Sequence, residues 1–518
     1  MIPLEVFIHL LHGQMAEAKI DYFNFLGGLN TGVSPLLMGQ SESGKSMLTV
    51  LDGCNISYKL GAIIKDTGYV RVGAAALEAN KSILGLFNFR QNGTTQKMLA
   101  TVDDATSDDT QLFFSTGGNW TEVGAAETAW ANFATMNVEM ETFIEYCFFV
   151  GHGTTDGFLP VGSLTGTTFS TSVNVTSMAQ GKFIKRYRDR LYVYNTRSAG
   201  TNYPQRCYFS SVPTAGAITW TSTDFFDVDY AEIGTGLGSN WDKLLLFTEY
   251  NVYIYDQTQL KQFYDIGCSN HRTIKNSGVY TFWANRDGVW ASTGGQPQNV
   301  AGEVIDFIRQ GNPLNFFSEV VDEEYWMYVG TVTVDNLTYT NCAVVYNIPT
   351  KTWRVREFAQ NMTMFGRYNN SGDDKLWMGN TLGVVYDKAK YTDSTVYSSD
   401  GATSSATDGS AIAAQFELAP IIIDTSINKS LNELIAYADR AQGLKLSARV
   451  LDKNARALTP YKPIGELVSF VNKFTINVDK GSILQIQGNE LSTLPYFSFY
   501  GLSLKVSDYG EIKHSNTR

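Results

Sequence analysis

A unit made of a strand, a short turn and a tryptophan recurs along this chain and limits the folds open to it. In each copy the predicted strand ends in an aromatic and a small polar residue, and the tryptophan opens the next strand. The copies are Leu112–Ser115 with Trp120, Cys207–Ser210 with Trp220, and Val344–Asn347 with Trp353. The tryptophan intervals divide into units of roughly 40–50 residues, which is the length of a β-propeller blade. We therefore predict about six to eight blades, with the tryptophans packing between blades rather than stacking on a ligand.

Composition and periodicity favour an all-β protein. Aromatic residues make up 13% and charged residues 18% of the 518 residues, and aromatic side chains fit a pleated sheet well. Residues 445–450 and 501–506 alternate polar and apolar side chains, so one face of each predicted strand points inward. Helical periodicity is confined to Ala125–Met136 and Val304–Arg309.

Local composition divides the chain into five predicted segments. Residues 1–74 form an N-terminal arm with the first strands, and residues 75–390 form the propeller. Residues 391–410 are rich in Ser, Thr, Asp and Gly, which predicts a linker loop because such residues bury little apolar surface. Residues 411–510 contain about six alternating strands, the size of a β-sandwich. Residues 511–518 are polar and predict a tail.

Net charge and the rarer residue types exclude several classes of site. The net charge of −11 is unsuited to a sequence-reading nucleic-acid binder, which needs a basic face. Five cysteines without a C-x-x-C pair predict free thiols in a protein folded in a reducing cytoplasm. Only His9 and His12 lie close together among the histidines, and we predict no metal site and no cofactor. No segment approaches the roughly 18 consecutive apolar residues of a transmembrane helix.

The run Gly39–Ser46 satisfies the phosphate-binding pattern G-x-x-x-x-G-K-[ST]. In a nucleotide hydrolase Lys45 would balance phosphate charge and Ser46 would bind Mg²⁺. The pattern is informative only between a buried parallel strand and a helix, yet the preceding segment begins at Pro35 and Gly53 stops any helix soon after. A second run, Ile421–Asp424, resembles a Walker B strand but lies in the predicted sandwich. We interpret Gly39–Ser46 as a solvated turn.

Acidic clusters are candidates for catalytic pairs, because many propellers are glycosidases that need two carboxyl groups. The hairpin Asn285–Trp290 also resembles part of a sialidase Asp box, without its Ser and its Asp spacing. Most acids at strand ends belong to solvated turns, and His152 and His271 have no neighbouring motif, so we predict no catalytic residue. The acidic clusters are Asp103–Asp104, Asp108–Asp109, Asp227–Asp229 and Asp322–Glu324.

One dense basic run, Lys185–Arg190, is a candidate for contacting DNA phosphates. In a strand, Arg186, Arg188 and Arg190 would share one face. The alternative is a solvent-facing strand in which Asp189 is the partner of the arginines.

The order of several segments resembles the propeller proteins of bacteriophage tails, particularly the nozzle or tail-stabilising proteins of short-tailed phages. Asn24–Thr31 with Pro35 resembles their opening Gly-Gly segment. Gly61–Gly73 is similar to the strand that they carry before the first blade, although Lys65-Asp66-Thr67 replaces their Arg-Pro pair. Three later segments are similar to their blade signatures: Arg206–Ser210, Ile266–Ile274 and Arg286–Trp290.

This resemblance implies a non-enzymatic component of the virion tail that is assembled in the host cytoplasm. The chain would form a homo-oligomeric ring, expected to be a hexamer, below the portal, with an adaptor protein above it and fibres around it. DNA would pass through the ring with transient, non-specific contacts, and no membrane would be involved. Two alternatives stay open: a propeller that binds or hydrolyses carbohydrate for host attachment, and a P-loop nucleotide hydrolase.

Overall fold

In the computed structural model the chain divides into two compact units. It describes residues 17–31, 49–91, 95–104, 107, 109–153, 157–229, 232–240, 242–370, 372–390, 399–402, 409–422, 429–452, 456–476, 483–491 and 497–508. One unit, which we call the propeller unit, comprises residues 67–351 and 356–410. The other, the sandwich unit, comprises residues 1–66, 352–355 and 411–518.

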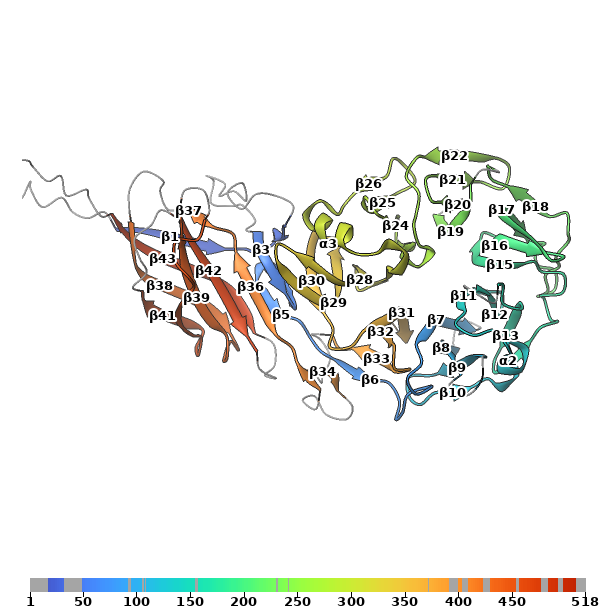
Figure 1. The fold of residues 1–518 in the computed structure, drawn as a ribbon, viewed down its shortest axis with the longest axis horizontal. Coiled ribbons are helices and arrows are strands. Elements are labelled where there is room, and N and C mark those ends of the chain that lie inside the picture. The colour runs from blue at the N-terminus through green and yellow to red at the C-terminus, as the bar shows by residue number, and fades with distance from the viewer. Residues whose placement is uncertain are drawn as a thin grey trace, which may run out of the picture. The chain divides into compact units, whose positions relative to one another are not determined.

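Seven sheets form the described part of the propeller unit (Figure 1). The first strands of the seven sheets are β7, β11, β15, β19, β23, β27 and β31. Each of them contacts the first strand of the next sheet, and β31 contacts β7, so the ring of sheets closes. This arrangement is a seven-bladed β-propeller, and it confirms the fold predicted from the recurring units.

The blades follow one another along the chain, and the first strand of each is the innermost. Blade one consists of β7 (Ile83–Gln91), β8 (Thr95–Asp103), β9 (Thr110–Ser115) and β10 (Thr121–Glu122). Blade two consists of β11 (Asn137–Phe143), β12 (Tyr146–His152), β13 (Gly162–Thr165) and β14 (Thr168–Ser170). Blade three consists of β15 (Gln180–Tyr187), β16 (Arg190–Ser198), β17 (Thr201–Phe209) and β18 (Phe225–Asp227). Blades four and five consist of β19 (Gly234–Asn240), β20 (Lys243–Thr248), β21 (Val252–Tyr255), β22 (Leu260–Tyr264); and β23 (Lys275–Ser277), β24 (Tyr280–Asn285), β25 (Gly288–Ser292), β26 (Gln298–Asn299). Blades six and seven contain β27 (Phe317–Val321), β28 (Glu324–Val334), β29 (Leu337–Asn347); and β31 (Met362–Asn370), β32 (Asp373–Asn380), β33 (Val385–Lys388).

The fourth strand of blade seven comes from the N-terminal part of the chain. β6 (Tyr69–Arg71) pairs antiparallel with β33, so the segment that precedes blade one in the chain completes the sheet of blade seven. β34 (Ser399–Ala402) adds parallel to the other side of β6. The two strands approach closely at Gly68, where a Cβ would lie 1.9 Å from the carbonyl oxygen of Ser399.

These pairings change two boundaries that the sequence predicted. The propeller includes residues 67–74, which were assigned to the arm. Part of the predicted linker 391–410 is a strand, and its Asp400 is buried in an ion pair with Arg356. A short, polar strand is mistaken for a loop when its stability comes from a neighbour distant in sequence.

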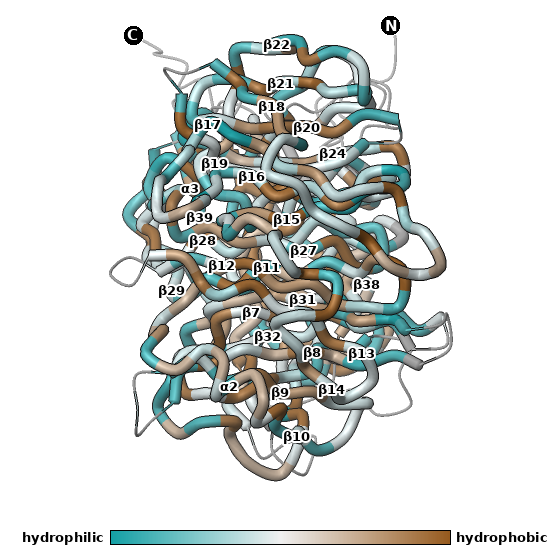
Figure 2. Tube along the Cα trace, turned by 90° about the vertical axis from the view of Figure 1, so that its right-hand side faces the viewer, coloured by the Kyte–Doolittle hydropathy of each residue, from teal (hydrophilic) through white to brown (hydrophobic). Residues whose placement is uncertain are grey.

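Hydrophobic residues fill the space between adjacent blades. One cluster joins blades one and two around Trp130, and another joins blades two and three around Trp220. Figure 2 shows apolar and polar segments alternating along the blade strands. Trp120 contacts Trp377 of blade seven at a ring distance of 5.8 Å. Trp120 and Trp220 therefore pack between blades, as predicted, although Trp220 lies in the loop before β18 and opens no strand. Trp353 is buried in the sandwich unit instead, so the prediction is wrong for this residue.

Regular α-helix in the described residues is limited to two short segments. α2 (Gly124–Ala129) and α3 (Ile305–Gln310) have six residues each, in the two places where helical periodicity was found. No helix of the described ranges is long and apolar enough to cross a membrane.

The sandwich unit contains two sheets drawn from both ends of the chain. One sheet has the order β4 (Ile56–Ser57), β5 (Ile63–Lys65), β43 (Ser498–Asp508), β38 (Lys429–Asp439), β41 (Val471–Thr475), with β1 (Glu17–Phe23) also on β43. The other has the order β30 (Thr352–Glu357, through Val355), β2 (Gly28–Leu29), β3 (Thr49–Cys54), β36 (Ala414–Leu418), β42 (Ile483–Glu490), β39 (Lys445–Leu451), β40 (Lys462–Glu466), with β37 (Ile421–Ile422) on β42. The two sheets meet through aromatic side chains, and Phe499 contacts both Phe25 and Phe416.

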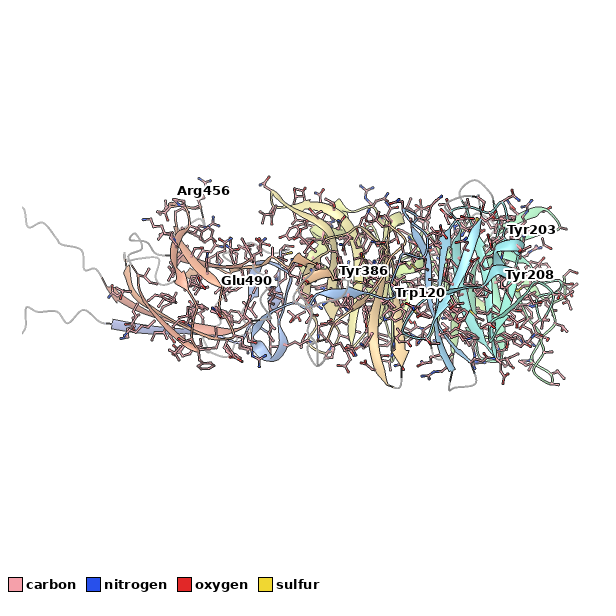
Figure 3. All side chains as sticks on the ribbon, turned by 90° about the horizontal axis from the view of Figure 1, so that it is seen from below. Trp120, Tyr203, Tyr208, Tyr386, Arg456 and Glu490 are labelled. Atoms are coloured by element: carbon pink, nitrogen blue, oxygen red, sulfur yellow. The ribbon has the colours of Figure 1, made fainter. Side chains whose placement is uncertain are left out.

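The N-terminal segment is therefore part of the sandwich and not a separate arm. Lys65 at the end of β5 forms a buried ion pair with Glu490 at the end of β42, which joins the two sheets (Glu490 is labelled in Figure 3). Next to it, Asp66 pairs with Arg354 at 2.8 Å. The sequence identified a sandwich at 411–510 correctly, but its strands β1 to β5 and β30 come from elsewhere in the chain.

Candidate functional site

The innermost strands of the propeller enclose a channel with a cavity of about 300 Å³. Charged side chains from five of the seven blades line it, together with His271 from the 3₁₀ turn His271–Thr273. Along β11 the buried Val138 and Met140 alternate with the half-buried Glu139 and Glu141, because successive side chains of a strand point to opposite faces of its sheet. The charged lining residues are Glu139, Glu141, Lys185, Lys275, Glu319 and Arg367.

Oppositely charged residues pair across neighbouring blades in this channel. Lys185 Nζ lies 2.8 Å from Glu141 Oε2, and Lys275 Nζ lies 3.2 Å from Glu319 Oε2. Arg367 makes a two-pronged contact with Asp374 of its own blade. Each acid of the channel thus faces a cation, so the channel has little net charge.

Glu139 is the most strongly held acid of the channel. His271 Nε2 lies 3.3 Å from Glu139 Oε2, and Arg272 Nε lies 4.0 Å from Oε1. The Leu237 N–H donates to His271 Nδ1 at 3.2 Å, so the imidazole proton sits on Nε2 and faces Glu139. Burial alone would raise the pKa of Glu139, but His271, Arg272 and Lys275 outweigh it and lower the pKa to about 2.

Glu139 is unsuited to act as a general acid. Glycoside hydrolysis needs one carboxyl group whose pKa is raised so that it carries a proton at neutral pH. The pKa of Glu139 is lowered, and Glu141 forms an ion pair with Lys185, whose pKa the glutamate raises against the effect of burial. The pairs Lys185–Glu141 and Lys275–Glu319 join neighbouring blades.

Two of the predicted acidic clusters do meet in space. Carboxylate oxygens of Asp104, Asp109 and Glu127 lie within 4.8 Å of one another. The Ser107 hydroxyl lies within hydrogen-bond distance of both aspartates, and the Asn132 N–H donates to Asp109, so neighbouring donors already contact the two aspartates. We assign no metal to the cluster.

The other predicted acids take structural roles. Asp227 forms a two-pronged ion pair with Arg206, with N–O distances of 2.8 and 2.9 Å. Asp322 lies in the turn between β27 and β28 and pairs with Lys390 at 3.0 Å. In the hairpin Asn285–Trp290, the asparagine oxygen accepts hydrogen bonds from Asp287 N–H and Trp290 Nε1, so this segment is a turn cap and not a sialidase element.

The basic run is divided by a turn, and the prediction that its arginines share one strand face is wrong. β15 ends at Tyr187 and β16 begins at Arg190, while Arg188 has a φ of +51°. Lys185 points to the channel, and Arg190 donates to the carbonyl oxygen of Ser210. A hairpin turn was not predicted because it contains neither Gly nor Asn.

Several predicted features lie outside the described residues, namely Gly39–Ser46, His9, His12, Asp108, the end of Ile421–Asp424 and the tail 511–518. The five cysteines are all described; each is buried and none is bonded to another. Burial raises the pKa of the Cys268 thiol to about 11, so this thiol is protonated at neutral pH and unreactive.

The charged channel was missed by reasoning from sequence. Glu139 and Glu141 alternate with Val138 and Met140, which is the signal of any half-buried strand. Their partners lie on blades distant in sequence, and no local pattern identifies them.

No protein-family model matches the chain, and no curated protein matches it. Among solved structures, the chain is similar to YCF48 from Cyanidioschyzon merolae (8% identity, TM-score 0.38, covering 61% of this chain and 99% of that one). It is also similar to the Pan2 WD40 domain of Neurospora crassa (9% identity, TM-score 0.38, covering 64% of this chain and 99% of that one). A third similar structure is the AfRom2 CNH domain (10% identity, TM-score 0.36, covering 62% of this chain and 99% of that one). At these TM-scores the assignment of a propeller rests on the strand pairing described above.

Proposed function

We propose that this chain is a structural subunit of a virion tail, which assembles into a ring with copies of itself. The ring, expected to be a hexamer, would contact an adaptor protein above it and fibres around it. DNA would pass through the centre of the ring with transient, non-specific contacts. The proposal rests on the order of segments that resemble tail nozzle proteins, and on one surface of the sandwich unit.

That surface, which we call the aromatic face, carries the proposal. Phe23 of β1, Phe470, Val471 of β41 and Tyr500 of β43 are 41%, 59%, 51% and 38% exposed. Phe470 lies 5.9 Å from Tyr500 between ring centres, and Phe23 lies 5.3 Å from Tyr437 of β38. Exposed apolar patches of this kind mark protein–protein interfaces. Among the described strands, β41 pairs with β38 alone, which leaves an edge that a neighbour can cover.

The propeller channel is too small to hold a DNA duplex, which is consistent with the same proposal. A cavity of about 300 Å³ has the size of a small-ligand site, and its ion pairs join neighbouring blades across it. A DNA duplex would therefore run through the centre of the assembled ring rather than through one propeller. The net charge of −11 would then repel phosphates and limit adhesion.

The test is the mass of the assembled particle. Phe470→Glu together with Val471→Lys places charges on the aromatic face, where both side chains are exposed, so folding should be kept. We expect the full chain to form a ring in mass photometry and negative-stain images, and the double variant to stay monomeric. Tyr250→Glu, an exposed aromatic in a propeller turn, is the matched control and should assemble normally. Normal assembly of the double variant would contradict the proposal.

The enzymatic alternatives gain no support from the described residues. The pKa of Glu139 in the channel is lowered rather than raised, and Gly39–Ser46 lies outside the described ranges.

A further inference from the structure

A second cavity, of about 640 Å³, opens at the end of the channel where the innermost strands begin. Its walls come from the starts of β11, β27 and β31, from the end of α3, and from the turn Asn312–Asn315. Seven of its lining residues have side-chain amides: Asn137, Asn270, Gln310, Asn312, Asn315, Asn341 and Asn361. Its size falls in the range of small-ligand sites, roughly 300–1,000 Å³. We call it the amide pocket.

The amide pocket is almost without charge, in a chain that has 51 acidic residues. None of its described lining residues is Asp or Glu, and Arg272 is the one charged group among them. That guanidinium is occupied, because it donates to the carbonyl oxygen of Leu84 at 2.5 Å and lies 4.0 Å from Glu139. The pocket is therefore suited to a neutral ligand.

Internal hydrogen bonds fix how several amides are oriented. Asn361 Oδ1 accepts from the Tyr328 hydroxyl at 2.7 Å, and Asn312 Oδ1 accepts from the Leu314 N–H at 3.2 Å. Each of these bonds uses the oxygen and leaves the NH₂ group as a donor. Asn270 uses both ends of its amide, to Arg272 N and to the carbonyl oxygen of Leu314, and so holds the turn in place.

Three further amides bring both donors and acceptors to the pocket. Asn137, Gln310 and Asn315 have no side-chain hydrogen bond to another residue of the described ranges. Such groups match ligands whose own groups donate and accept at once, as sugar hydroxyls do. The preorganised and the adaptable amides together provide the few convergent polar groups that a binding site needs.

The apolar lining argues against a peptide ligand. Phe317, Tyr328 and Met362 are each at most 5% exposed, so their side chains pack into the core and not against a ligand. Only Leu314 offers an exposed apolar side chain among them, at 69%. A peptide would need apolar subsites for its side chains, whereas a hydroxyl-rich ligand would not.

We propose that the amide pocket binds a neutral oligosaccharide and does not hydrolyse it. Hydrolysis by a pair of carboxyl groups needs two acids beside the glycosidic bond, and the pocket supplies amides instead. This binding would be a further activity of the chain, independent of ring assembly, because the pocket lies wholly in the propeller unit and the aromatic face in the sandwich unit.

The test uses the full chain on an array of defined neutral and uronic-acid-containing oligosaccharides, followed by calorimetry with the best-bound neutral sugar. Gln310→Ala with Asn315→Ala removes two amides that make no contact needed for folding. We expect this double variant to raise the Kd at least tenfold, which corresponds to about 1.4 kcal/mol. Asn202→Ala, an exposed asparagine on β17 of blade three, is the matched control and should bind like the parent.

A second variant protects the test against misfolding. Asn361→Asp keeps an acceptor for Tyr328 but removes the donor, so binding should weaken while the thermal transition stays in place. Three results would overturn the proposal: no neutral sugar bound by the parent chain, equal binding by the double variant, or release of reducing ends from a bound sugar. Preference for acidic sugars or for peptides from a random library would overturn it as well. Ring mass, measured on the same variants, should be unchanged and so separates this test from the proposed function.

Discussion

The buried ion pair between Lys65 and Glu490 predicts how strongly the N-terminal strands hold the sandwich. The two side chains are 1% and 3% exposed, so water cannot solvate either charge if its partner is removed. Breaking such a pair costs about 3–5 kcal/mol, because the remaining charge is buried alone. Replacing both charges by apolar groups of similar volume is neutral or stabilising by about 1–4 kcal/mol.

We therefore expect Lys65→Met and Glu490→Leu each to lower the stability of the sandwich unit, and the double variant to recover it. For a unit of this size, about 3–5 kcal/mol corresponds to a fall in Tm of roughly 6–20 °C. The coupling energy from the double-mutant cycle isolates the pair from other effects of each change. Lys473→Met is the matched control: it removes an exposed cation from Glu433, which keeps Lys505 as a partner, and should cost at most about 1 kcal/mol.

A single tryptophan makes the assay specific to the sandwich unit. Trp353 is buried there, and the other eight tryptophans belong to the propeller unit. In protein labelled with 5-fluorotryptophan, the ¹⁹F resonance of Trp353, assigned with Trp353→Phe, reports the unfolding of the sandwich during a urea titration. If either single variant unfolds at the urea concentration of the parent, or if the double variant is no better than the singles, the pair does not join the two sheets as described.

Three further predictions concern the propeller and the phosphate-binding pattern. Gly68→Ala should increase hydrogen exchange in β34, because the new Cβ would lie 1.9 Å from a carbonyl oxygen of that strand. Gly302→Ala is the control, because a Cβ there meets nothing within 4 Å. Equal exchange in the two variants would contradict this prediction. Acid should destabilise the propeller in two steps, because burial lowers the pKa of His152 to about 4 and the pKa of Glu139 is lowered to about 2. Both groups bind a proton more readily in the unfolded chain, so stability falls from about pH 6.5 to 4 and again from about pH 4.5 to 2; His152→Gln and Glu139→Gln should each flatten one step in urea titrations across pH. Lys45→Ala should leave nucleotide binding unchanged, with no ATP affinity in either protein by calorimetry, and micromolar affinity lost in the variant would refute the interpretation of a solvated turn.

The propeller could be predicted because most of each blade is local in sequence. Strands of a blade follow one another through short turns, so their spacing and the recurring tryptophans appear directly in the chain. The strands 445–450 and 501–506, which became parts of β39 and β43, could be predicted from their own alternation, whatever their partners. Local pairing leaves a periodic pattern that can be read without a structure.

Strands that pair with distant partners could not be predicted. β6 has three residues and pairs with β33 more than 300 positions later, and β1 pairs with β43 near the other end of the chain. Nothing in such short segments identifies the partner. Removal of residues 1–74 should therefore open the seventh blade, which loses β6, and leave the sandwich without β1 to β5.

In the candidate sites, too, the sequence shows the residue types but not the residues that they contact. The acids at 139 and 141 and the asparagines of the amide pocket are ordinary residues of alternating strands and turns. Their roles arise because seven blades bring them to a common axis. Residue type therefore predicted which chemistry was available, and only the closed ring decided which groups meet.

The aromatic face is defined by the complete chain, which connects folding with the proposed assembly. Phe23 comes from the first described strand, while Phe470 and Tyr500 come from strands near the end of the chain. Contacts so distant in sequence form late, because a long loop must close before they stabilise anything. During synthesis the propeller strands are complete before β43 exists, so the face that would bind a neighbour is assembled last. Chains that stop early would lack β43, the strand that pairs with β1, β5 and β38, and would be excluded from the ring.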